Sequence, residues 1–158
     1  MKRSHGFGES AEMYLKTIAK LADERELVPV TSVANPLGIS TVSASEMIHR
    51  LQDRELLNHI PYKGVYLTEE GRRRANGVIR RHRLWECFLT DELGITWEMV
   101  HEYACRLEHA ISDEVTKALA DYLENPETCP HGNPIPSADG EMPSLDGIPL
   151  SDLEMGDQ

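Results

Sequence analysis

The apolar residues of this 158-residue chain recur mainly at the three- and four-residue spacing of α-helices, and one β-prone stretch interrupts the pattern. We predict helices over about Ser10–Asp23, Thr31–Leu37 and Thr41–Glu55. Residues 56–68 follow as a predicted hairpin, because Tyr62-Lys63-Gly64 is typical of a turn between two strands. Three short helices followed by a hairpin are the layout of a winged helix-turn-helix.

In the second half of the chain the sequence pattern predicts helices and an irregular segment, without strands. A long helix should begin behind a capping hydroxyl at Thr68 and end at Gly94, a residue suited to helix ends. Two shorter helices are expected, over Trp97–Ile111 and from Ser112 to about Asn125. Residues 126–158 hold 6 of the 9 prolines and 4 of the 11 glycines, which predicts an irregular segment, partly ordered against the helices.

The net charge of −11 is divided unevenly along the chain. Residues 1–83 hold 14 Lys and Arg against 10 Asp and Glu, a net of +4, whereas residues 84–158 hold 2 against 17, a net of −15. Such asymmetry favours one half that meets an anion and another that meets cations or a partner, or else a solubilising acidic tail. Six arginines between Arg72 and Arg83 are expected to add positive charge to the long helix.

Several classes of protein are excluded by the sequence. The apolar runs are only a few residues long, so we expect no membrane span, and the first residues do not lead into the apolar stretch of a signal peptide. The three cysteines are an odd number without C-x-x-C spacing, which argues against a secreted disulfide scaffold. We therefore expect a cytoplasmic protein.

The third predicted helix has two distinct faces. Ala44, Ile48 and Leu51 are spaced to face the core. The opposite face begins with a short polar side chain and continues with arginines, which suits a helix that meets bases and phosphates in a major groove. The alternative is an ordinary solvated helix surface. The residues of this predicted DNA contact are Ser43, Glu46, Met47, Arg50 and Arg54 on the helix, and Lys63 at the hairpin tip.

Residues with metal-binding side chains gather on one face of the helix predicted over residues 97–111. At about 100° per residue, the pattern His101-x3-Cys105-x2-Glu108-His109 spans about 100° of arc. Imidazole, thiol and carboxylate groups on one face suit a divalent transition metal, although buried His and Cys are often structural. His82 and Glu86, spaced i, i+4 on the preceding helix, also share a face.

Three further residues have metal-binding side chains but ambiguous positions. Met13 lies away from the apolar stripe of its helix, so it is either a surface methionine or a thioether contact to a neighbouring element. Cys129 and His131 could form a site, but the prolines around them favour a rigid loop.

Together these features resemble the metal-dependent repressors of the diphtheria toxin repressor and iron-dependent regulator type, with manganese-dependent regulators as cousins. The resemblance covers about residues 9–136. It rests on Glu12-Met13-Tyr14-Leu15, Arg81-His82-Arg83-Leu84, Leu89-Thr90-Asp91, Val100-His101-Glu102, Ala104-Cys105-Arg106-Leu107-Glu108-His109, Ser112-Asp113-Glu114-Val115 and His131-Gly132-Asn133-Pro134-Ile135-Pro136.

The resemblance implies a mainly α fold: a winged helix-turn-helix DNA-binding domain at residues 1–74, an all-helical metal-binding and dimerisation domain at 75–136, and an irregular tail at 137–158. It implies homodimers on palindromic operator DNA. The implied regulatory metal ligands are Met13, Cys105, Glu108 and His109, and the implied ancillary ligands are His82, Glu86 and His101. The residues that fall where such repressors approach DNA are Ser40, Thr41, Val42, Ser43, Glu46 and Arg50.

The chain departs from this family in two ways. Many iron-dependent members continue into an SH3-like domain that supplies further ancillary ligands, and this chain stops at Gln158, about where that domain would begin. It is either naturally short or truncated, and we expect water to complete the ancillary site. Manganese-type cousins use carboxylates where this chain has Met13 and Cys105, and these softer sulfur ligands favour metals later in the Irving–Williams series than Mn(II).

We therefore expect a repressor of metal-homeostasis genes that is activated by a divalent metal. Fe(II) is the expected metal, with Mn(II), Co(II), Ni(II) or Zn(II) as possible substitutes. The alternatives are a manganese-responsive regulator of the same family, a winged-helix regulator without a metal gate, and an enzyme with Cys105 as nucleophile. The last is disfavoured because the sequence lacks a nucleophile elbow, an oxyanion-hole loop and a glycine-rich phosphate cradle.

Overall fold

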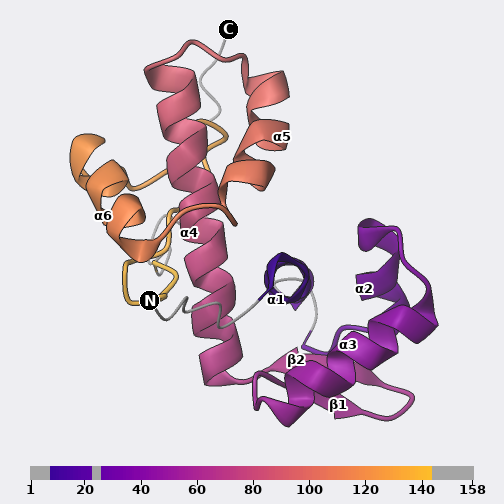
Figure 1. The fold of residues 1–158 in the computed structure, drawn as a ribbon. Coiled ribbons are helices and arrows are strands. Elements are labelled where there is room, and N and C mark those ends of the chain that lie inside the picture. The colour runs from indigo at the N-terminus through magenta and orange to yellow at the C-terminus, as the bar shows by residue number, and fades with distance from the viewer. Residues whose placement is uncertain (1–7, 23–25, 144–158) are drawn as a thin grey trace, which may run out of the picture.

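The computed structural model describes residues 8–22 and 26–143. Its elements are α1 (Glu9–Ala22), α2 (Val30–Leu37), α3 (Thr41–Asp53), β1 (Leu57–Ile60), β2 (Gly64–Leu67), α4 (Glu69–Asp91), α5 (Trp97–Leu107) and α6 (Asp113–Tyr122). The mainly α fold and the predicted order of helices and hairpin are confirmed. Helix α4 runs along the molecule, with α5 and α6 beside one part of it and α1, α2, α3 and the hairpin beside the other (Figure 1).

The N-terminal elements share one hydrophobic core. Leu15 and Ile18 of α1 are completely buried in it, together with Ile48 of α3 and Leu57 and Val65 of the hairpin. The predicted inner face of α3 is confirmed, and the Ser40 hydroxyl caps this helix by accepting a hydrogen bond from the Ser43 N–H.

The β-hairpin is antiparallel and pairs Leu57 with Leu67 and Ile60 with Gly64. Val28 forms an isolated bridge to Val65, so the chain between α1 and α2 crosses close to the hairpin. Gly64 has a φ of +140°, and a Cβ there would lie 2.4 Å from the Val28 carbonyl oxygen. This position therefore requires glycine, and the requirement fixes the hairpin against the chain that leaves α1.

Helix α4 passes through the predicted domain boundary between residues 74 and 75. Its Ala75 and Ile79 still belong to the N-terminal core, whereas Leu84 and Cys87 belong to a second core with residues of α6 and the following loop. Thr68 caps α4 as predicted, since its hydroxyl accepts from the Gly71 N–H. One continuous helix thus connects the two cores.

The irregular segment after α6 packs along α4 as far as residue 143. Asn76 donates to the Gly140 carbonyl at 2.8 Å, Arg80 donates to the Pro136 carbonyl at 2.9 Å, and Arg83 donates to the Pro134 carbonyl. The prediction that part of this segment is ordered is confirmed; residues 144–158 of the predicted tail lie outside the described residues.

The arginines of α4 differ in how far they are exposed. Arg72, Arg73 and Arg74 are exposed, and the last two pair with Glu70. The three arginines further along are half-buried and donate to carbonyl groups of other segments. In the residues that the structure describes, no helix combines the length and the apolar character needed to cross a membrane.

Candidate functional site

The His109 ring connects α1 with the chain just beyond α5. Its Nε2 lies 3.1 Å from Met13 Sδ and 3.1 Å from Glu108 Oε1. Its Nδ1–H donates to Glu12 at 2.6 Å, and Glu12 also pairs with Arg81 at 3.1 Å. Because Nδ1 is occupied by Glu12, Nε2 is the ring nitrogen that is left to ligate a metal, and it lies against Met13 and Glu108. Three of the four expected regulatory ligands therefore converge.

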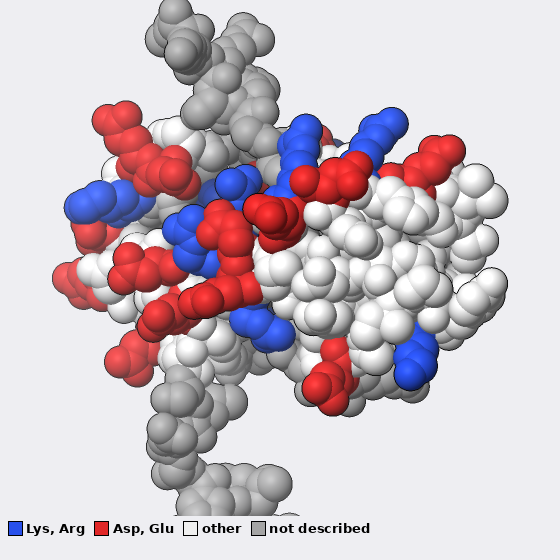
Figure 2. Space-filling model, turned by 90° about the horizontal axis from the view of Figure 1, so that it is seen from below, with Lys and Arg blue, Asp and Glu red and all other residues white. Residues whose placement is uncertain are grey.

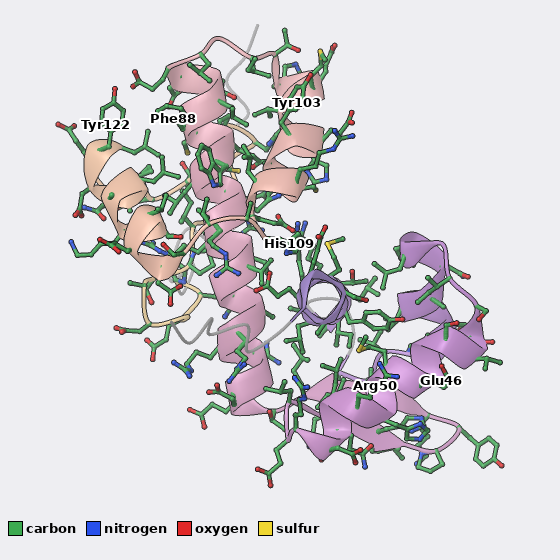
Figure 3. The ribbon with its side chains drawn as sticks, in the orientation of Figure 1. Glu46, Arg50, Phe88, Tyr103, His109 and Tyr122 are labelled. Carbon is green, nitrogen blue, oxygen red and sulfur yellow. The ribbon has the colours of Figure 1, made fainter. Side chains whose placement is uncertain are left out.

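The sequence pattern predicted that His101, Cys105, Glu108 and His109 lie on one face of a helix, and the structure differs from this prediction. Helix α5 ends at Leu107, with Glu108 at its C-cap and His109 beyond it, so the four residues do not share one helical face. Cys105, which is still within α5, lies beside His82 and His101. Its Sγ is 3.6 Å from His101 Nε2. His109 instead lies toward α1 (Figure 3). There Glu12 and Met13 contact it.

The three expected ancillary ligands form a small triangle. His82 Nε2 lies 2.9 Å from Glu86 Oε1 and 3.1 Å from His101 Nδ1, and the latter two atoms are 3.6 Å apart. Tetrahedral bonds of about 2.0–2.1 Å to nitrogen and oxygen separate ligand atoms by about 3.3 Å. The triangle therefore has the dimensions of a transition-metal site, and Cys105 borders it.

The two ligand groups touch through Glu108 and His82. His82 Nδ1 lies 2.6 Å from Glu108 Oε2, while its other nitrogen contacts Glu86. All three side chains are almost completely buried, with exposed fractions of 4% or less. The His82 ring thus donates to two buried carboxylates at once.

Besides Glu12, which contacts His109, sequence reasoning missed Lys16 at this site. Its ammonium donates to both oxygens of Glu108, at 2.8 and 2.9 Å, and lies 3.3 Å from His82 Nδ1. The side chain is only 5% exposed. The available signal was its position three residues after Met13, on the same side of α1. A buried cation thus lies against a candidate metal ligand.

Ionisation of the site follows from these contacts. Burial opposes the charge on His82, but hydrogen bonds with Cys105, Glu108 and Glu86 outweigh it and raise the pKa of His82 to about 9. Burial also opposes the charge on Glu86, yet its contacts with His82, and then with Cys129 and His131, lower its pKa to about 2.

The pKa of Glu108 is lowered as well, because His82 and Lys16 outweigh its burial. In the metal-free chain an imidazolium and an ammonium therefore neutralise the buried carboxylates. The donor set fits a divalent transition metal: Met13, Glu108 and His109 would hold one ion, and His82, Glu86 and His101 another.

The expected DNA-facing residues lie on α3 and at the hairpin tip. Val42 is 68% exposed, and Thr41, Ser43, Glu46, Arg50, Arg54 and Lys63 are exposed as well. Met47 is the exception, because it is half-buried and packs against the N-terminal core. In Figure 3, Glu46 and Arg50 lie along α3, on the other side of α1 from His109.

Charge is unevenly distributed on the face seen in Figure 2. Acidic and basic side chains crowd the side of α4 and α6, whereas the N-terminal elements present a mostly uncharged surface with few Lys and Arg. A few cations on this surface, rather than a broad basic patch, are available for phosphate contacts.

The far end of the helical half exposes large apolar side chains. Trp97 is 63% exposed, Tyr122 61% and Leu93 59%. Phe88 packs edge-on against Tyr122, with ring centroids 5.9 Å apart, and Tyr103 lies across α4 on α5 (Figure 3). Exposed aromatic and aliphatic side chains of this size are typical of protein interfaces.

Comparison with protein families matches almost the whole described chain. Residues 6–65 match the iron dependent repressor N-terminal DNA-binding domain, and residues 68–137 match the iron dependent repressor metal-binding and dimerisation domain.

Individual relatives agree with the family models. A diphtheria toxin repressor of Corynebacterium jeikeium is 40% identical over 91% of this chain and 59% of its own length. An iron-dependent repressor IdeR of Mycobacterium tuberculosis is 41% identical over 81% of this chain and 56% of its own. A solved manganese-dependent transcriptional repressor in complex with manganese is 42% identical, with a TM-score of 0.78 over 86% of this chain and 63% of that structure. The chain therefore spans less than two thirds of these relatives' lengths.

Proposed function

Because the chain belongs to the iron-dependent repressor family, we propose that it represses transcription as a homodimer that binds palindromic operator DNA when a divalent metal is bound. The family is one of DNA-binding repressors, which removes the enzyme alternative. The observation that carries the proposal is the contact of Met13 on α1 with His109 beyond α5.

Helix α1 is suited to couple the two halves of the chain. Leu15 and Ile18 bury one side of α1 in the core of the N-terminal elements. On its other side Met13 contacts His109, and Lys16 contacts Glu108. When bound, a divalent metal supplies coordination bonds that draw a thioether, a carboxylate and an imidazole together. Ligation by Met13 would therefore fix the DNA-binding core relative to α4 and α5.

This coupling bears on DNA binding because a dimer must present two recognition helices at once. The two α3 helices need a separation of about 34 Å, one turn of DNA. Where the relative position of these helices varies, the affinity for DNA falls in proportion to the fraction of conformers that can bind. We propose that the large apolar side chains exposed on α5 and at the ends of α4 and α6 form the dimer interface. By packing against a second copy of the chain they would set the distance between the two α3 helices. These side chains include Leu93, Trp97, Met99, Tyr103 and Tyr122.

Fe(II) is the proposed metal. Met13 contributes a thioether to the His109 site, and Cys105 is a free thiol that borders the ancillary group and lies 3.9 Å from Lys16 Nζ. Sulfur ligands disfavour Mn(II) relative to later divalent metals, and among these Fe(II) is the most available in a cytoplasm. Cys105 was expected among the regulatory ligands, but in the structure it lies beside His82 and His101. We propose that it either moves toward the His109 site when metal binds or serves as a ligand of the ancillary site.

The test is a selection of operator DNA followed by titration with each metal. Random duplexes selected on the Co(II)-loaded protein should yield a palindrome, and anaerobic fluorescence anisotropy should then show activation by Fe(II) and Co(II) at lower free concentration than by Mn(II). Carboxylates in place of Met13 and Cys105 should reverse that order. Binding that is equally tight in chelator would refute the metal gate, and a wild-type preference for Mn(II) would refute the assignment of Fe(II).

A further inference from the structure

Arg81 of α4 contacts two segments that carry the expected ligands of the His109 site. Its Nε–H donates to the Glu108 carbonyl at 2.7 Å, and its Nη2–H donates to Glu12 Oε1 at 3.1 Å. Glu108 is the C-cap of α5, and Glu12 belongs to α1. One guanidinium on α4 therefore connects α1 with the end of α5 in the metal-free chain.

Both contacts bear on the orientation of metal ligands. The last carbonyl groups of a helix have no partner within the helix, and an arginine side chain can accept this role, as Arg81 does for Glu108. The Glu12 carboxylate that pairs with Arg81 contacts His109 Nδ1 at 2.6 Å through its other oxygen. Arg81 thus holds the backbone of one expected ligand and the partner of another.

The surroundings of Arg81 favour two well-directed bonds. Its side chain is 14% exposed, and that of Glu12 is 22% exposed. A guanidinium is planar, so its N–H groups fix the directions of both bonds at once. A cavity of about 460 Å³ is lined by both residues together with the start of α6 and residues 138–140. Water can therefore enter where Arg81 is shortened, and the two contacts can be removed without leaving an empty apolar space.

We propose that Arg81 is a positioning residue of the His109 metal site. It holds the turn of Glu108 and His109 against α1 in the metal-free chain, so that Met13 meets the other two ligands with little further ordering. This role rests on the proposed metal site and adds to it a residue that is not a ligand. The ancillary triangle does not depend on Arg81, because its three ligands come from α4 and α5 themselves.

Hydrogen exchange of the arginine side chains tests the contact in the metal-free protein. The Nε–H of Arg81 should exchange with solvent at least about tenfold more slowly than that of Arg106. Arg106 pairs with Glu102 on the surface of α5, with a side chain that is 74% exposed. Proton–nitrogen correlation spectra follow both signals, which Arg81→Lys and Arg106→Lys assign. Equal exchange rates would overturn the proposal.

Cobalt affinity tests the positioning role. The His101→Ala background leaves the ancillary triangle one ligand short, so that the His109 site can be titrated. In this background Arg81→Met should weaken Co(II) binding about tenfold, and the matched control Arg106→Met should not change it. Arg81→Lys should lie between them, because it keeps the charge but not the planar guanidinium. In the His109→Ala background, Arg81→Met should leave Co(II) binding at the triangle unchanged.

Circular dichroism shows which variants fold, and Arg81→Lys replaces Arg81→Met in the comparison if the latter does not. The proposal is overturned if the Arg81 variants bind Co(II) like Arg106→Met, or if they weaken both sites equally, as a general loss of structure would. Absence of Co(II) binding in His101→Ala itself would refute the proposed His109 site and this role with it. None of these measurements uses DNA, so failure here is distinguishable from failure of the proposed repressor function.

Discussion

Lys16 on α1 and Glu108 at the end of α5 form a buried ion pair, with Lys16 Nζ 2.8 Å from Glu108 Oε2. The pair holds α1 near the helical half without any metal. It also places an ammonium where Glu108 would ligate a dication, so the two cations compete for one carboxylate. Lys16 therefore both stabilises the metal-free chain and opposes metal binding.

Replacement of Lys16 by methionine separates these two roles. Lys16→Met should raise metal affinity at the His109 site, because Glu108 no longer has to leave an ammonium. It should also lower the melting temperature of the metal-free protein, because a buried carboxylate loses its partner. Isothermal titration and thermal unfolding measure the two effects.

The matched control for that variant is Lys117→Met. Lys117 pairs with Asp121 on the exposed surface of α6, with a side chain that is 78% exposed. This pair should contribute little, and neither metal affinity nor stability should change appreciably. Metal affinity that is unchanged in Lys16→Met would show that Lys16 does not compete at Glu108.

Substitutions of different ligands should impair either one or both of the ligand groups. His109→Ala should abolish metal-activated DNA binding, while the ancillary triangle, which does not contain His109, keeps its metal. His82→Ala should impair both ligand groups, because His82 contacts Glu86 and Glu108 together. Metal content of the dialysed variants and anisotropy with operator DNA measure this. A His109→Ala variant that responds to metal like the parent contradicts the assignment.

Metal binding should strengthen as the pH rises. The pKa of His82 is raised to about 9, so its ring is protonated at neutral pH and must release a proton before it can ligate a metal. For one released proton the affinity should increase about tenfold per pH unit between pH 7 and 9. His82→Asn should flatten this slope, and a slope that is already flat in the parent would contradict the protonated His82.

The same pKa shift predicts how the stability of the metal-free protein depends on pH. A raised pKa in the folded state stabilises the fold below the ordinary histidine pKa of about 6.5, and this stabilisation is lost as the pH rises through about 9. Urea unfolding from pH 7 to 10 should therefore show a falling free energy of unfolding, and His82→Asn should reduce that fall.

Substitutions in α3 should distinguish phosphate contacts from base contacts. Arg50→Ala should weaken binding to operator DNA and to unrelated DNA equally, and it should reduce the salt dependence of that binding. Ser43→Ala or Glu46→Gln should instead change the preferred sequence, because both exposed residues lie nearer the N-terminal end of α3. Binding to a panel of operator variants at two salt concentrations measures the difference.

Local chemistry explains which parts of the fold could be predicted from the sequence. The hydroxyl caps at Ser40, Thr68 and Ser112 and the spacing of His82 and Glu86 depend on neighbours within one helix, and the structure agrees with them. Periodicity could not give the end of α5, because the chain leaves the helix to bring His109 to Glu12.

The burial of Lys16 and the place where the loop of Cys129 and His131 packs could not be derived from periodicity, for a related reason. Lys16 lies outside the apolar stripe of α1 yet is buried, because its partner Glu108 comes from a distant part of the sequence. The loop is irregular, and bonds from arginine side chains on α4 to its carbonyls determine where it packs. Long-range polar contacts of this kind leave no periodic signal.

Reciprocal linkage between metal and operator DNA tests the metal gate most directly. If ligation by Met13, Glu108 and His109 favours the conformation that binds DNA, operator DNA must tighten metal binding by the same factor by which metal tightens DNA binding. Co(II) affinity measured with and without the selected operator should show this equality, and His109→Ala should remove it. A Co(II) affinity that is the same in the presence and absence of operator DNA would contradict the account.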